Sequence, residues 1–177
     1  TCALPICAIE LVNGSSIDLL RVDFNGNRGF YGGGISSRHE SVVKAAECDF
    51  IGNTGWSGAG ILSRYECTVE LDDCLFQGNI AEIHGGAMTI RDGTTLEMDG
   101  CDLVGNQGLA QGSLEGGGGA IQFAVGASAV IRGSTFRGNF TSSTGGAIGN
   151  SSGSNILIEQ SSMVDNVASL QGNAVAT

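Results

Sequence analysis

The sequence predicts an all-β fold in which short parallel strands stack coil upon coil into a β-solenoid. Three observations predict it: two motifs alternate along the chain, one spacing within the repeat is constant, and apolar residues alternate with polar ones along that spacing. About six and a half coils of 26–33 residues cover the sequence. We therefore expect one solenoid domain over residues 1–177, with an inserted loop at 109–117.

The two motifs recur in phase. The first is a large apolar residue followed three positions later by Asn, as in Phe50 and Asn53, and its asparagines are Asn27, Asn53, Asn79, Asn106, Asn139 and Asn166. The second is a glycine-rich run ending in an apolar residue that we call the closer. The closers are Ile35, Ile61, Met88, Ile121, Ile148 and Val175, with a partial first copy ending at Ile9.

The spacing between the motifs divides each repeat into two arms. From each closer to the next motif asparagine the distance is always 18 residues, and we call this segment the locked arm. From each asparagine to the next closer it ranges from 8 to 15 residues, and we call this segment the variable arm. Stacked coils behave in this way when strand pairing holds one side in register and a loop on the other side accepts insertions.

Alternation within the locked arm predicts two strands. Counted from the closer, positions +8, +10, +13 and +15 are small or apolar and point inward, as with Val43, Ala45, Cys48 and Phe50 in one copy. Apolar residues two apart with polar residues between them are typical of strands. The step of three between +10 and +13 predicts a turn between the two strands.

Composition and charge exclude several classes of function. Apolar residues make up 41% of the chain, enough for a core, and the 30 glycines are periodic rather than those of a disordered chain. The net charge of −10 argues against nucleic acid and against an anionic membrane surface. Because no run of 18 apolar residues occurs, we expect no membrane span.

The ends of the sequence cut through a repeat. The chain starts inside a variable arm and stops two residues after Val175. Open solenoid ends leave strand edges unpaired and normally need caps. We expect the chain to be a piece of a longer protein, or a subunit whose neighbours cap its ends.

The two motifs together resemble those of the polymorphic outer-membrane protein family, known from chlamydial surface autotransporters. Six alternating pairs of Phe-x-x-Asn and Gly-Gly-Ala-Ile elements, complete or degenerate, cover nearly the whole chain. The pattern departs from the family at 109–117 and at 172–175. The resemblance implies a right-handed parallel β-helix displayed outside the cell, with a role in adhesion or surface architecture.

The glycine runs and the asparagine column have architectural interpretations. A phosphate loop needs a helix behind it and usually a Lys, but no helix is predicted, and Lys44 is the single lysine. We expect glycine where the backbone takes a positive φ or passes close to its neighbour. The asparagines are predicted to form a stacked amide ladder that also caps turn backbone groups.

Three cysteines share one inward column. Cys48, Cys74 and Cys101 occupy position +13 of successive coils. A vertical line of thiols does not enclose a tetrahedral metal, so we expect buried, small apolar side chains. One vertical disulfide is sterically allowed, because the strand spacing of about 4.8 Å falls within the Cα range of disulfides.

The other cysteines and the two histidines lie outside this column. Cys2 and Cys7 precede the regular coils, and we expect that they can pair as a disulfide. Cys67 falls in a turn and is expected to be exposed. His39 and His84 stand at different phases of the repeat, so we do not expect them to meet.

Acidic residues cluster on the outward face of the locked arm. Asp18, Glu70 and Glu97 share position +9, with Lys44 between them. We favour a solvated face, as is usual for a charged stripe. Two alternatives stay open. The first is that these carboxylates bind calcium. The second is that they include a carboxylate pair for glycan cleavage, with Lys44 or Arg21 as the base.

Two groups of residues are candidates for modification or contact. Asn13 and Asn150 head glycosylation sequons, whereas the Asn139 sequon belongs to the ladder and is not expected to be used. A partner-contact surface is predicted on the variable arms, where loops are free to vary. Its residues are Tyr31, Trp56, Leu109, Gln111, Leu114 and Glu115.

These features favour a non-enzymatic extracellular or cell-surface module that acts as an adhesin or as a structural protein. It would bind no cofactor, and its partner would be a protein or glycan on another surface. One alternative is a filament subunit that associates with itself end to end. The other is a polysaccharide-active β-helix enzyme.

Overall fold

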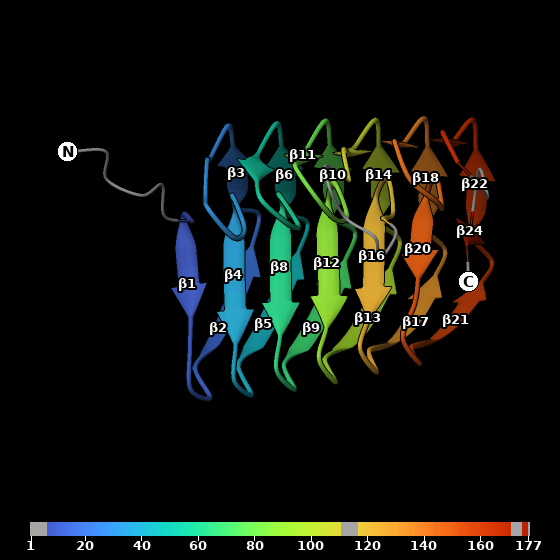
Figure 1. Cartoon of the computed structure of the whole chain (residues 1–177). Helices are drawn as coiled ribbons and strands as arrows, with labels where there is room; N and C mark the ends of the chain where they lie inside the picture. Colours follow the sequence, from blue (N-terminus) through green and yellow to red (C-terminus); the bar gives the residue numbers. More distant parts are fainter. Residues whose placement is uncertain (1–6, 111–116, 171–174, 177) are drawn as a thin grey trace.

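The computed structural model describes residues 7–110, 117–170 and 175–176. In this part of the chain, parallel strands form four sheets, and each sheet takes one strand from each successive coil. Figure 1 shows the coils side by side, with the strands of one sheet standing in a row along the molecule. The predicted all-β solenoid is confirmed.

The locked arm contributes three of the four sheets, and two of these hold its predicted strands. The long sheet runs through β2 (Ser16–Leu20), β5 (Val42–Ala46), β9 (Thr68–Asp72), β13 (Thr95–Asp99), β17 (Ser128–Arg132) and β21 (Asn155–Glu159). The phenylalanine sheet runs through β3 (Asp23–Asn25), β6 (Asp49–Ile51), β10 (Leu75–Gln77), β14 (Asp102–Val104), β18 (Thr135–Arg137) and β22 (Ser162–Val164).

The third sheet of the locked arm starts at the closers, and the fourth sheet lies in the variable arms. The closer sheet runs through β1 (Ile9–Leu11), β4 (Ile35–Arg38), β8 (Ile61–Arg64), β12 (Met88–Arg91), β16 (Ile121–Ala124), β20 (Ile148–Asn150) and β24 (Val175–Ala176). The arm sheet runs through β7 (Thr54–Gly55), β11 (Ile80–Ala81), β15 (Gln107–Gly108), β19 (Phe140–Thr141) and β23 (Val167–Ala168).

The register of the strands follows the sequence columns. Val43 pairs with Val69, and Val69 pairs with Leu96, so position +8 forms one row of the long sheet. A shift by one residue would turn every side chain of a strand to the opposite face. The constant 18-residue spacing therefore reflects pairing on every coil.

The prediction of two strands in the locked arm was incomplete, because each closer begins a third strand there, and short strands such as β7 add a fourth in the variable arm. Outward residues of the third strand, such as Leu62 and Thr89, are buried rather than exposed. The variable arm lies over them, and Ser57 of one arm donates a hydrogen bond to Thr89 at 3.0 Å. A strand that is covered on both faces lacks the alternation of apolar and polar residues by which a strand is recognised in a sequence.

The core consists of like side chains stacked from coil to coil. The rings of Phe24, Phe50 and Phe76 lie parallel, with centroids 4.7 and 4.5 Å apart and interplanar angles of 4° and 1°. All three are buried. Offset-stacked aromatic rings attract beyond their area burial.

The glycines before each closer are needed for close backbone approach. A Cβ at Gly33 would lie 2.7 Å from the carbonyl oxygens of both Ala59 and Thr54, nearer than side-chain carbons come. A Cβ at Gly60 would lie 2.9 Å from the Ala87 carbonyl oxygen. Close packing of the variable arm against the next coil therefore explains the Gly-Gly-Ala-Ile motif.

Candidate ligand-binding site

The motif asparagines form a hydrogen-bonded ladder inside the solenoid. The Asn79 side chain donates from Nδ2 to the Phe50 carbonyl oxygen at 2.8 Å and to Asn106 Oδ1 at 2.9 Å. Its own Oδ1 accepts from the backbone N and the Nδ2 of Asn53, at 2.9 and 3.0 Å. From Asn53 to Asn166 these side chains are buried. The ladder is therefore part of the architecture and offers no surface to a ligand.

The three sequons differ in how accessible their asparagines are. Asn139 is a buried member of the ladder, and its Nδ2 already donates two hydrogen bonds. Asn13 is exposed in a turn, with φ at 55°. Asn150 is half-buried, and its Nδ2 donates to the Ser154 carbonyl oxygen at 3.4 Å. Asn13 thus presents the most accessible amide of the three.

The +13 cysteines form a second ladder. Cys48 Sγ accepts the Val22 amide at 3.4 Å, and Cys101 Sγ accepts the Cys74 amide at 3.4 Å. Each thiol also donates to a carbonyl two residues earlier, such as that of Ala46 for Cys48. All three thiols are free and buried. These thiols therefore form hydrogen bonds with the backbone as well as filling space. The sequence predicted only that they are buried, small apolar side chains.

Cys67 was wrongly expected to be exposed. Its exposed fraction is 1%, because its thiol points back into the turn and donates to the Arg64 carbonyl oxygen at 3.2 Å. Ser41, one coil earlier, closes its turn in the same way through the Arg38 carbonyl.

Cys7 is a half-buried free thiol, whose pKa is raised by burial. Cys2 lies outside the described residues, so a disulfide between them stays a prediction.

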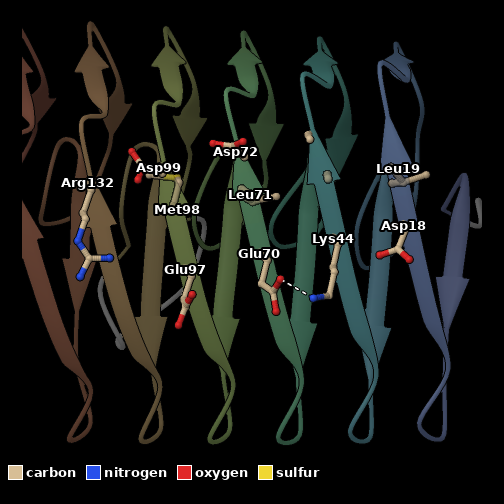
Figure 2. A pocket seen from close by; sticks show the side chains of 12 residues that line it. Asp18, Leu19, Lys44, Glu70, Leu71, Asp72, Glu97, Met98, Asp99 and Arg132 are labelled. Carbon is tan, nitrogen blue, oxygen red and sulfur yellow. Dashed lines mark ion pairs between the residues drawn. The ribbon is translucent and has the colours of Figure 1, made fainter.

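The acidic residues border a hollow on the outward face of the long sheet. Figure 2 shows Asp18, Lys44, Glu70 and Glu97 in one row across neighbouring strands. The hollow, about 390 Å³ in volume, ends at Arg132. The row is partly neutralised, since Lys44 Nζ lies 2.7 Å from Glu70 Oε2.

The chemistry available in this hollow is limited by exposure. Lys44 and Glu70 keep 50% and 41% of their side-chain surface, and Arg132 is already paired with Glu159 at 3.0 Å. The side chains of Asp18 and Glu97 are exposed as well, and Glu70 is engaged by Lys44. Among the described residues, no group of three or more His, Cys, Asp or Glu could hold a metal ion.

A second surface lies on the variable arms, where three aromatic side chains gather. Phe30, Tyr31 and Trp56 are each 42% exposed. The Phe30 and Trp56 rings stack with centroids 5.6 Å apart and an interplanar angle of 19°, and the Phe30 and Tyr31 rings meet edge to face at 5.0 Å. Tyr31 and Trp56 were predicted contact residues, whereas Phe30 was missed. We call Phe30, Tyr31 and Trp56 the aromatic platform.

Two hollows border the aromatic platform and share Trp56. The larger, about 630 Å³, is lined on its apolar side by Phe30, Trp56, Ile80 and Leu109. Leu109 is half-buried there, so one residue of the predicted insertion loop joins the platform. The predicted contact residues Gln111, Leu114 and Glu115 lie outside the described residues.

The smaller hollow, about 180 Å³, is lined by two arginines. Arg64 and Arg91 reach it from neighbouring strands of the closer sheet, beside Tyr31, Trp56 and His84. The Arg64 guanidinium carbon lies 4.5 Å from the Tyr31 ring centroid and 5.2 Å from that of Tyr65. The two histidines stand apart in the repeat, since His39 stacks on Tyr65 and His84 lines this hollow.

Sequence reasoning missed the arginines, although a signal was present. Arg38 pairs with Arg64 in the register of the closer sheet, and Arg91 follows at the same position of the next coil. Their spacings of 26 and 27 residues equal the local repeat length. Extending the column analysis past the closer would have found them.

Coils of parallel strands, internal ladders of like side chains and hollows on the variable arms define a solenoid repeat protein. The family model of the right-handed β-helix region matches residues 7–176. The chain therefore belongs to the right-handed β-helix family, and the predicted hand of the helix is confirmed. Comparisons with curated proteins and with solved structures each gave no match. No helix that could cross a membrane occurs in the described part of the chain.

Proposed function

We propose that this β-helix is a non-enzymatic binding module, an adhesin of the cell surface or extracellular space, whose aromatic platform contacts a glycan. The observation that carries the proposal is the exposure of Phe30, Tyr31 and Trp56 side by side on the variable arms. Exposed aromatic clusters mark contact surfaces, because they bury much area at little entropic cost. The apolar faces of sugar rings pack well against such rings.

The rest of the molecule supports a rigid display of this surface. Stacked phenylalanines and the asparagine ladder hold the coils in register below the platform. A site on a rigid scaffold loses little entropy on binding. The motif resemblance to the polymorphic outer-membrane proteins adds weight to a surface role, and an accessible Asn13 would suit a glycosylated exterior.

A binding experiment tests the proposal. Oligosaccharide arrays, followed by calorimetry on the oligosaccharides that bind, compare Trp56→Ala with Leu157→Ala. Leu157 is 49% exposed on β21 of the long sheet, so its truncation removes apolar surface away from the platform. We expect Trp56→Ala to abolish glycan binding and Leu157→Ala to keep it. Equal binding by both variants, or no glycan bound by the parent protein, contradicts the proposal.

The rival function is cleavage of a polysaccharide in the acidic hollow. Its specific support is a row of carboxylates next to Lys44 and Arg132, at the spacing of neighbouring strands. Strand spacing of about 4.8 Å brings two carboxylates near the separation used by retaining glycosidases. Release of reducing ends or of unsaturated sugars from the bound glycans, abolished by Glu70→Gln, would establish the rival and remove the non-enzyme claim.

A further inference from the structure

We propose that the glycan bound by the aromatic platform is acidic, and that Arg64, assisted by Arg91, receives its carboxylate or sulfate in the small hollow beside Trp56. This inference rests on the proposed function and deepens it. It names the ligand class and the residue that selects it.

Arg64 is held in place but is not neutralised. Its guanidinium lies against the rings of Tyr31 and Tyr65. Its Nε is buried, without a hydrogen-bond partner in the described structure. No carboxylate of the described residues lies within ion-pair distance of it, whereas Arg38 is paired with Glu10 at 2.8 Å and Arg91 with Asp92 at 3.2 Å. A buried donor without a partner is costly, and a guanidinium that has no carboxylate partner attracts an anion that enters the hollow.

Charge complementarity favours an anion at this place. Arg64 and Arg91 line the small hollow, and Arg28 and Glu82 line the larger one, in a chain with a net charge of −10. Asp92 pairs with Arg91, so Arg64 carries the positive charge left uncompensated in the small hollow. Charges farther away are screened over about 8 Å at physiological ionic strength, so the local arginines dominate inside the hollow. A planar guanidinium matches a carboxylate or sulfate through two parallel hydrogen bonds.

The size and surroundings of the small hollow favour an acidic sugar over an acidic peptide. Its volume of about 180 Å³ suits one charged substituent and part of its ring. Peptides commonly gain affinity by adding a strand to a free sheet edge. Here β8 is already paired with β4 and β12, so the site offers rings and donor side chains but no backbone edge.

The test compares ligands that differ in charge, and it compares variants whose arginine substitution lies either in the small hollow or away from it. The probes are a hexasaccharide with alternating glucuronate units, its methyl ester, a sulfated hexasaccharide without carboxylates, and a poly-glutamate peptide. Binding of the parent protein is measured by calorimetry, together with Arg64→Gln, Arg64→Lys and Arg137→Gln. The last variant makes the same charge change on β18, away from the hollows. Thermal unfolding of each variant verifies that it is folded.

We expect the acidic hexasaccharide to bind about tenfold or more tightly than its methyl ester, with that preference lost in Arg64→Gln, reduced in Arg64→Lys and kept in Arg137→Gln. The sulfated probe tells which anion the site prefers, since either preference over the neutral ester supports the inference. Equal binding of acid and ester, equal effects of Arg64→Gln and Arg137→Gln, or preference for poly-glutamate overturns it. Trp56→Ala separates the proposed function from this inference. If Trp56→Ala no longer binds the methyl ester, glycan binding by the aromatic platform is supported even when the parent protein shows no preference for the acid.

Discussion

The locked arm and the variable arm of each coil come from the same repeat but obey different constraints. In the locked arm, every residue of β5 or β9 has a partner in the next coil, and the inward side chains stack on their equivalents. In the variable arm, strands such as β7 and β11 are only two residues long, and the rings of Phe30 and Trp56 are exposed rather than buried. The difference explains why one spacing is fixed and the other is not.

The comparison shows where a β-helix can change without unfolding. Pairing on both sides of each coil makes the locked arm intolerant of length changes, because register is shared with two neighbours. The variable arm also carries exposed side chains, such as Phe30, Tyr31 and Trp56, where substitution costs little stability. Function placed on these exposed positions is therefore decoupled from the core.

The largest difference between the two arms is expected when one residue is inserted into each of them. One glycine inserted between Val69 and Glu70 in β9 shifts the following side chains to the wrong face of the sheet. We expect loss of the cooperative fold in far-ultraviolet circular dichroism and thermal unfolding. The same insertion after Ala110, in the insertion loop of the variable arm, is expected to leave the melting temperature within a few degrees of the parent. Equal damage at both places would refute the distinction.

A matched pair of phenylalanines tests the packing of the two arms. Phe50 is fully buried between Phe24 and Phe76, so Phe50→Ala should destabilise the protein by about 3–5 kcal/mol. Phe30 is 42% exposed, and Phe30→Ala should cost less than about 1 kcal/mol. Urea unfolding measures both, and similar values for the two variants would mean that the platform belongs to the core.

The asparagine ladder gives the next smaller effect. Asn79→Ala leaves the Asn53 amide and the Phe50 carbonyl without their partners, at a cost on the order of 1–3 kcal/mol. Asn155, exposed on β21, is the control, and its replacement by Ala should change the free energy of unfolding by no more than about 0.5 kcal/mol. A ladder variant as stable as the control would show that water replaces the lost hydrogen bonds.

The smallest effect concerns pH. Burial raises the pKa of the Cys48 thiol, so above the ordinary thiol pKa the unfolded chain releases a proton that the folded chain keeps. The stabilisation that the Cys48 thiol contributes is complete below its pKa in the unfolded chain. As the pH rises above that value, the free energy of unfolding falls by at most about 1.4 kcal/mol per pH unit for this thiol. Cys48→Ser should lose less of its free energy of unfolding between pH 8 and 10, because a serine hydroxyl does not titrate in this range. Serine fits the site, since Ser134 and Ser161 occupy the same column in later coils. Parallel stability curves for the parent and the variant would contradict this.

The fold could be predicted because every coil repeats the same physical requirement. Alternation at Val43, Ala45, Cys48 and Phe50 recurs at one spacing, and only parallel stacking satisfies all copies together. The closer strand escaped prediction because the variable arm buries its outward residues, such as Leu62. The burial of Cys67 escaped because a turn position says nothing about a side chain that folds back onto the Arg64 carbonyl.

The candidate site was harder to predict because it arises between coils rather than within a repeat. Trp56 and Tyr31 were recognised as singular residues of the variable arms. Their meeting with Phe30 and Arg64 depends on how arms of successive coils lie against one another, which no single repeat shows. The acidic face, in contrast, followed directly from position +9.

Amide hydrogen exchange with and without the acidic hexasaccharide tests the central claim most directly, namely that the stacked sheets of the locked arm build the fold and that the variable arms, together with Arg64 and Arg91 at the ends of the closer strands, bind the ligand. We predict slow exchange in the long and phenylalanine sheets whether or not ligand is present. Added protection is predicted in peptides covering 28–34, 54–64 and 82–91. Protection instead around Lys44, Glu70 and Glu97 would contradict the account and assign binding to the acidic hollow of the locked arm.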